Sequence, residues 1–287
     1  MQFIIEINLV ILIVSVFTRL MFLVLNPHER VATFFRKTAL INLVIEFFFN
    51  LLALCVLISC CTLVSSVFAL SSEFQYILYL SVVSVIVHFY SYFFYYTIDT
   101  YLNKKKEITE LFSEANLVNR NISVYEYDDK EFNAYSTGVF SNTRQILFSK
   151  KLYELLNKEE RYGIIMHEVA HFQHHDLLKR YMLQVGLTIV FAFCMYSANQ
   201  SDIIDEYLLT AIMGGLYGGL NVTLVGLISK KQEHVADLFS LHSTGKPYVI
   251  DALKRMNTAT QGLLNKKSLS YPTLDERIQF IKKHSRT

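Results

Sequence analysis

The chain has 287 residues, of which 52% are hydrophobic and only 18% are charged. Soluble domains contain roughly 25% charged residues, so this composition excludes an ordinary soluble protein and favours an integral membrane protein. The formal net charge of +2 is too small to indicate nucleic-acid binding, and we expect no nucleic-acid partner. All four cysteines lie in apolar stretches without metal-ligand spacing, which favours core residues over a disulfide framework.

Five apolar segments are long enough to cross a bilayer, because about 20 mainly apolar residues span its hydrocarbon core. No basic region precedes the first segment and no small-residue cleavage site follows it, which favours a retained span over a removable signal peptide. The sequence therefore predicts a mainly α-helical integral membrane protein with about five transmembrane helices. They lie at about residues 3–25, 39–70, 75–98, 181–198 and 207–229.

Lysine and arginine are unevenly distributed among the loops between these segments. The loops that contain Arg36, Lys104, Lys179 and Lys230 all fall on one side of the predicted membrane. The turns on the other side, at 71–74 and 199–206, contain no lysine or arginine. Because short cytoplasmic loops carry an excess of these residues, we expect a multi-pass protein of the cell membrane with its N-terminus outside and its C-terminus in the cytoplasm.

The spans and loops divide the chain into two predicted domains. Residues 1–98 form an N-terminal transmembrane region with three spans, and residues 99–287 form a small cytoplasmic α+β domain. A transmembrane hairpin at about 181–229 splits this second domain. Its first part contains short strands at 122–127 and 145–149 and a helical pattern over 158–180, and its second part contains helices that start near Val249 and Thr273.

The stretch His167-Glu168-Val169-Ala170-His171 lies within the predicted helix and carries the strongest chemical signal in the chain. Residues four apart lie on one helix face, so His167 and His171 can bind the same zinc ion. Glu168 can then take a proton from the attacking water as a general base. The pattern predicts a zincin-like metalloendopeptidase with one Zn²⁺ per chain, and the alternative is a pair of histidines on a surface helix.

A catalytic zinc site usually has three protein ligands and an open position, so a third ligand is expected. One extended pattern, with a glycine and then a third histidine, is excluded because His174 and Leu177 occupy those positions. Glu233 is the best candidate, and Asp237, one turn later, can accept a hydrogen bond from a ligand histidine. His234 competes with Glu233, but adjacent helical residues do not share a face, so only one of them is expected to reach the metal.

Over residues 100 to 280 the chain resembles the gluzincin membrane metallopeptidases, typified by HtpX, the type II CAAX prenyl endopeptidase and the mitochondrial Oma proteases. The resemblance rests on short motifs whose order and spacing match. These are Asn133-Ala134-Tyr135, Ile146-Leu147-Phe148-Ser149, Glu159-Glu160, His167 to His171, Asp176, Glu233 to Asp237, Tyr271-Pro272 and Glu276-Arg277-Ile278.

The resemblance implies the zinc ligands and the catalytic base named above, and it adds three further residues. It implies that Asn133 lies on or beside the edge strand that binds substrate. It also implies that Arg277 lies near the active site, where it can hold the substrate or the oxyanion. The family commonly has His-Pro where this chain has Tyr271-Pro272, and the tyrosine hydroxyl can still donate a hydrogen bond to an oxyanion.

These observations predict a membrane-embedded, zinc-dependent endopeptidase that hydrolyses membrane or membrane-proximal proteins, with a polypeptide substrate and the bilayer as partners. One alternative is a regulatory peptidase of the BlaR or MecR type that cleaves one dedicated partner. Those proteins carry an extracellular sensor domain after the last span, where this chain has a tail of under 60 residues. Another alternative is a catalytically silent zinc-binding membrane scaffold, against which the intact Glu168 argues. The sequence specifies neither the substrate nor the oligomeric state.

Overall fold

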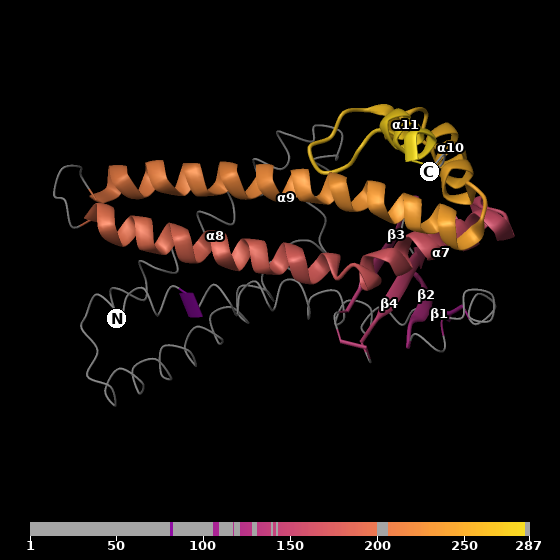
Figure 1. Cartoon of the computed structure of the whole chain (residues 1–287), viewed down its shortest axis with the longest axis horizontal. Coiled ribbons are helices and arrows are strands. Elements are labelled where there is room, and N and C mark those ends of the chain that lie inside the picture. The colour runs from indigo at the N-terminus through magenta and orange to yellow at the C-terminus, as the bar shows by residue number, and fades with distance from the viewer. Residues whose placement is uncertain are drawn as a thin grey trace. The chain divides into compact units, whose positions relative to one another are not determined.

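The computed structural model describes residues 143–199 and 206–284 continuously (Figure 1). It also describes shorter stretches at 81–82, 106–108, 117, 121–127, 131–138 and 140–141. The predicted spans at 3–25 and 39–70, and all but residues 81–82 of the span at 75–98, lie outside the described residues.

Two compact units make up the described part of the chain. One contains residues 181–225, and the other contains the described residues of 90–180 together with 226–287. The boundaries fall within two long helices, α8 (Asp176–Asn199) and α9 (Glu206–Thr244), so each of these helices contributes to both units.

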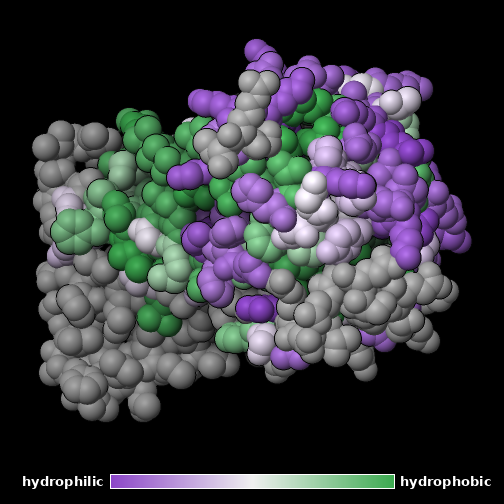
Figure 2. All heavy atoms as spheres, turned by 45° about the vertical axis from the view of Figure 1, so that its right-hand side comes forward, coloured by the Kyte–Doolittle hydropathy of each residue, from purple (hydrophilic) through white to green (hydrophobic). Residues whose placement is uncertain are grey.

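Helices α8 and α9 contain the apolar segments predicted at 181–198 and 207–229. Each is long and apolar enough to cross a membrane, over Asp176–Ser197 and Ala211–Thr244. The described part of the chain is thus mainly helical, with a small sheet and two candidate membrane spans, as the sequence predicts. Many of the side chains that these helices expose are large and apolar, and hydrophobic residues gather on this part of the surface in Figure 2. They include Met182, Ile189, Val190, Phe193, Leu208, Ile212, Leu216 and Leu220.

Polar side chains connect α8 and α9 within the first unit. The amide of Gln184 donates to Asn221 Oδ1 at 3.1 Å, and the hydroxyls of Thr188 and Tyr217 lie 2.7 Å apart. Asn221 also donates to the Tyr217 hydroxyl at 3.3 Å. Hydrogen bonds between apolar helices satisfy groups that lipid cannot, so this cluster pairs the two helices.

The sheet has four strands in the order β1 (Lys106–Glu107), β2 (Ser123–Tyr127), β4 (Gln145–Ser149) and β3 (Ala134–Thr137). Strands β2 and β4 run parallel, while β1 and β3 are antiparallel to their neighbours. Both strands predicted from the sequence are confirmed as β2 and β4. Strand β3 pairs only with β4 among the described residues, and it therefore forms an edge of the sheet.

Helix α7 (Lys158–Gln173) follows the short helix α6 (Lys150–Leu155) and begins with a capping box. The Asn157 side chain accepts from the Glu160 backbone N–H at 2.8 Å, and the Glu160 carboxylate accepts from the Asn157 N–H at 2.9 Å. The continuous helical pattern expected over 158–180 is wrong, because His175 adopts a φ of 53° and separates α7 from α8.

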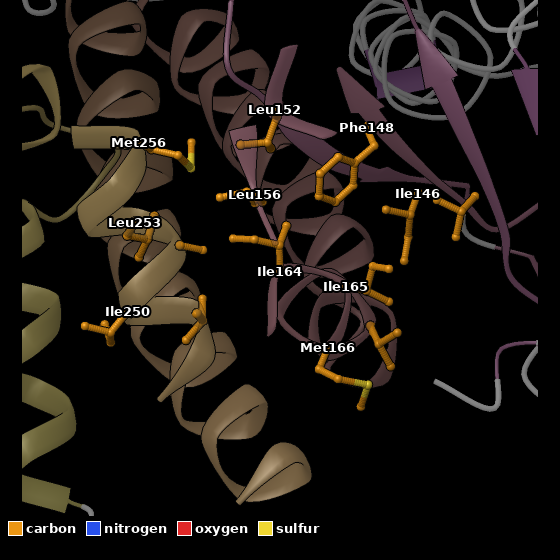
Figure 3. Close-up of a cluster of buried hydrophobic side chains, with 14 of the residues drawn as sticks. Ile146, Phe148, Leu152, Leu156, Ile164, Ile165, Met166, Ile250, Leu253 and Met256 are labelled. Atoms are coloured by element: carbon orange, nitrogen blue, oxygen red, sulfur yellow. The ribbon is translucent and has the colours of Figure 1, made fainter. Parts of the chain in front are cut away.

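The chain after α9 forms α10 (Tyr248–Ala259), the short 3₁₀ helix η4 (Leu263–Asn265) and α11 (Leu274–His284), which confirms the helices expected near Val249 and Thr273. A hydrophobic core fills the space between β4, α6, α7 and α10 (Figure 3). Its labelled members are Ile146, Phe148, Leu152, Leu156, Ile164, Ile165, Met166, Ile250, Leu253 and Met256.

Close backbone contacts fix the position of α7 within this unit. A Cβ atom on Gly163 would lie only 2.6–2.8 Å from atoms of Tyr248 and Val249 at the start of α10. On the side of α9, the Ser240 hydroxyl donates to the Gly163 carbonyl at 2.7 Å. Helix α7 is therefore held by both helices one turn before His167.

Candidate metal centre

Two histidines on α7 and one glutamate on α9 converge in the second unit. The rings of His167 and His171 lie nearly perpendicular to each other, with their centroids 5.0 Å apart. Glu233 faces both rings: its Oε2 lies 3.3 Å from His167 Nε2, and its Oε1 lies 3.7 Å from His171 Nε2. The helix spacing predicted from the sequence thus directs both imidazoles toward a single carboxylate.

This donor set fits a zinc ion. Tetrahedral coordination with bonds of about 2.1 Å separates neighbouring ligand atoms by about 3.4 Å. The nitrogen–oxygen separations of 3.3 and 3.7 Å lie on either side of that value. Glu168 is buried beside the same point, since its carboxylate and the two imidazoles offer ligand atoms within 4.8 Å of one another. Glu168 is therefore close enough to act on a water molecule at the open position.

The second nitrogen of each imidazole has its own carboxylate partner. His167 Nδ1 lies 3.0 Å from Asp237 Oδ1, and His171 Nδ1 lies 2.8 Å from Asp176 Oδ2. When Nδ1–H donates to a carboxylate, the ring is held in the tautomer whose Nε2 is available to a metal. Gln232 in turn donates to the Asp176 carbonyl at 3.2 Å, which ties the start of α8 to α9.

Asp176 is a functional candidate to which sequence analysis assigns no role, although it is one of the residues that carry the family resemblance. Its partner His171 lies five residues earlier, across the turn between α7 and α8. The available signal was an aspartate just beyond a ligand histidine, since histidine ligands usually donate to a carboxylate.

Arg277 on α11 binds the acidic residues of α9. Its Nε donates to Asp237 Oδ2 at 2.6 Å and its Nη2 donates to Asp237 Oδ1 at 2.5 Å, while Nη1 lies 3.6 Å from Glu233 Oε2. The guanidinium is buried, as a bidentate pair with a carboxylate permits. In this structure Arg277 therefore orients Asp237 and lies beside the candidate ligand Glu233.

The electrostatics of the centre favour a cation. Burial lowers the pKa of His167, but its hydrogen bonds to Asp237 and Glu233, together with their negative charges, outweigh burial and raise that pKa to about 10. Burial likewise lowers the pKa of Arg277, and Asp237, Glu233 and Glu168 together raise it above its ordinary value. Zinc binds the neutral imidazole, so a zinc ion held here at neutral pH would displace a proton from His167.

The other predicted residues lie in different environments. The ring of His234 stacks on Phe280 with centroids 4.4 Å apart, so Glu233 rather than His234 faces the two histidines. His174 lies edge-on to Phe239. Tyr271, in the segment before α11, is 55% exposed, unlike the buried residues of the centre.

Asn133 is exposed and immediately precedes β3, the edge strand that contacts α7. Its backbone N–H donates to Ser149 Oγ at 3.1 Å, and its carbonyl accepts from the Ser149 N–H at 2.9 Å. The residue thus extends the pairing of β3 with β4 and lies beside the free edge of the described sheet.

The part of the chain that contains the candidate metal centre is similar to known proteins. The family model described as Peptidase family M48 matches residues 101–285. The protease HtpX homolog of Nitrosomonas europaea is 25% identical over 185 residues, which cover 54% of this chain and 62% of that protein. The protease HtpX of Buchnera aphidicola subsp. Schizaphis graminum is 26% identical over 202 residues, covering 59% of this chain and 68% of that protein.

A solved structure has a similar fold. Ste24p of S. mikatae superposes with a TM-score of 0.62 at 17% identity, covering 85% of this chain and 66% of that one. The chain therefore spans somewhat less than two thirds of the Nitrosomonas europaea relative and of Ste24p. Because the family match covers more than half of the sequence and contains every residue of the metal centre, the chain belongs to peptidase family M48.

Proposed function

We propose that this protein is a multi-pass membrane zinc endopeptidase that cleaves peptide bonds of membrane or membrane-proximal proteins on the cytoplasmic side. The proposal rests on one observation: His167 Nε2 and His171 Nε2 both face Glu233, and Nδ1 of each ring faces an aspartate. Such an arrangement is typical of a zinc site with an open position for catalysis.

His167, His171 and Glu233 would hold the ion, and Asp237 and Asp176 would orient the two rings. Bound zinc supplies polarisation of the scissile carbonyl and lowers the pKa of the attacking water. Glu168 takes the proton from that water and delivers it to the leaving amine. Arg277 holds Asp237 in place through its two hydrogen bonds, and its Nη1 adds positive charge beside Glu233.

The edge strand β3 offers a binding site for an extended substrate. Among the described residues β3 pairs on one side only, and its other side can accept a polypeptide strand, whose main chain would then run past the face of α7 that carries His167. Asn133 lies at the start of this edge, where its exposed side chain can contact the added strand. The roles of Arg277 and Tyr271 in holding substrate or the oxyanion remain predictions.

The test separates catalysis from metal binding in the purified full-length protein. Glu168→Gln should keep near-stoichiometric zinc, because Glu168 is not a proposed ligand, and it should lose at least about 100-fold in cleavage rate. His167→Ala should lose zinc and activity together. Zinc content is measured by atomic absorption and cleavage with an unfolded membrane-protein substrate. Wild-type cleavage by Glu168→Gln would exclude the mechanism, and a wild-type protein that binds zinc but cleaves nothing would favour the silent scaffold.

A further inference from the structure

The segment between α10 and α11, residues 260–273, combines exposed apolar and basic side chains. Leu263 is 42% exposed and Tyr271 is 55% exposed. Lys266 and Lys267 are exposed between them. Apolar and tyrosine side chains next to lysines are typical of segments that lie at a membrane interface, where the rings and alkyl chains enter the lipid and the charges stay in the headgroups.

A close contact attaches this segment to α9. A Cβ atom on Gly226 would lie 2.9 Å from Leu269 Cγ and 3.0 Å from the Leu269 carbonyl oxygen, so a larger residue at this position would force Leu269 to shift. Figure 1 shows the segment running alongside α9 before the chain turns back into α11. Gly226 lies near the end of the apolar stretch 207–229, which the sequence predicts as a membrane span, so the segment contacts α9 near the end of that span.

The side chains that α9 exposes change from apolar to basic at the same level. Leu216, Leu220 and Leu227 are each more than half exposed, and they form the last part of the apolar surface. Lys230 and Lys231 follow, and Lys230 lies about 6 Å beyond Gly226 at a rise of 1.5 Å per residue. Leucines give way to lysines where the segment contacts the helix, as expected where a helix leaves the lipid.

We propose that residues 260–273 form an interfacial segment that binds the surface of an anionic bilayer. Leu263 and Tyr271 contact the acyl chains, which for Tyr271 replaces the oxyanion role that the family resemblance implies. Lys266 and Lys267 contact lipid phosphates. Continuity with the exposed leucines of α9, together with the positive charge, favours lipid over a protein partner. The inference rests on the membrane placement of α8 and α9 in the proposed function, and it adds a second, peripheral contact between the peptidase domain and the membrane.

The chain contains no tryptophan, so a single introduced tryptophan reports its own surroundings. Leu263→Trp and, separately, Tyr271→Trp probe the segment. Leu216→Trp, at a residue 58% exposed on α9, is the control for lipid contact. His242→Trp is the aqueous control, because it is exposed on the same helix about 24 Å beyond Gly226. Each full-length variant is reconstituted in phosphatidylcholine vesicles with or without phosphatidylglycerol, and quenching by lipids brominated on the acyl chain is measured.

The brominated lipids should quench Leu216→Trp strongly, Leu263→Trp and Tyr271→Trp to an intermediate extent, and His242→Trp little. Adding Lys266→Gln and Lys267→Gln to Leu263→Trp should reduce the ratio of bound to unbound segment about fivefold per lysine in vesicles that contain phosphatidylglycerol. Quenching of both segment variants no greater than that of His242→Trp overturns the inference while leaving the proposed function intact. Absence of quenching in Leu216→Trp instead overturns the membrane placement of α9. The inference is also overturned if added peptide changes the tryptophan fluorescence of the segment variants and brominated lipid does not.

Discussion

Both ring nitrogens of each histidine in the metal centre have a defined partner. Nε2 of His167 and of His171 faces Glu233, while Nδ1 of each faces an aspartate. Four carboxylates, those of Glu168, Asp176, Glu233 and Asp237, surround these rings, and Arg277 pairs with the last two of them. A buried group of this kind needs positive charge, because isolated buried carboxylates are strongly unfavourable.

The ligand assignment predicts opposite results for two neighbouring residues. Glu233→Ala removes the carboxylate that faces both Nε2 atoms, so zinc affinity should fall by more than the roughly 10–100-fold that loss of a hydrogen-bond partner of a ligand costs. His234→Ala removes a ring that stacks on Phe280 and should leave zinc affinity unchanged. Zinc titration against a fluorescent chelator measures both. Loss of zinc in His234→Ala with retention in Glu233→Ala would reverse the assignment.

Asp176 should matter for metal binding although it does not face the metal. Asp176→Asn weakens the acceptor for His171 Nδ1–H, and zinc affinity should fall by roughly 10–100-fold. Asp251→Asn is the matched control, because Asp251 is half exposed and pairs only with Lys254 in the described structure. The same chelator titration compares the two variants, and equal affinities would show that Asp176 has no orienting role.

Local sequence spacing could predict part of this candidate centre, and the rest depends on contacts between distant residues. His167, Glu168 and His171 lie within five residues, so helix geometry alone relates them. Glu233 was expected from its chemical type and was chosen over His234, whose ring the structure turns toward Phe280. The role of Asp176 could not be predicted, because it depends on the turn at His175.

At the scale of single elements, α7 carries both histidines of the site. Substitution of one glycine in this helix tests how tightly it packs. Gly163→Ala places a Cβ atom 2.6–2.8 Å from Tyr248 and Val249, and overpacking of this kind costs about 1–3 kcal/mol. Thermal unfolding followed by static light scattering should show a lower midpoint. Gly186→Ala in α8 is the control, since its Cβ would meet nothing within 4 Å, and it should be neutral or slightly stabilising. Equal midpoints would mean that α7 can move away from α10.

The elements that periodicity did not predict are the short ones and the irregular ones, and β3 was expected only through the family resemblance at Asn133. Strand β1 has two residues and β3 has four, too few for an alternating pattern to be recognised. The turn between α7 and α8 uses a histidine with positive φ, a conformation that glycine or asparagine usually signals. Strands β2 and β4 and helices α10 and α11 were found because each has clear periodicity or a Gly or Pro boundary.

At the scale of the whole molecule, orientation in the membrane is the main prediction. Reporters fused after Asn103 or Thr287 should report cytoplasm, and one inserted in the turn at 199–206 should report the opposite side, because lysine and arginine concentrate on one side of the spans. Paired alkaline phosphatase and green fluorescent protein fusions measure this. An active phosphatase fused after Thr287 would show that the C-terminus lies outside the cytoplasm, which contradicts the predicted orientation.

Helix α9 continues without a break from its exposed leucines to Glu233. Glu233 lies six positions after Leu227, which is about 9 Å along the axis. With α9 in a bilayer, this rigid spacing holds the scissile bond at a fixed height above the lipid. An extended substrate rises about 3.3 Å per residue, so that height corresponds to roughly three residues. Under the proposed function, we expect the protein to select a bond by its distance from the membrane surface, so that substrates that share no sequence motif would be cut at the same level.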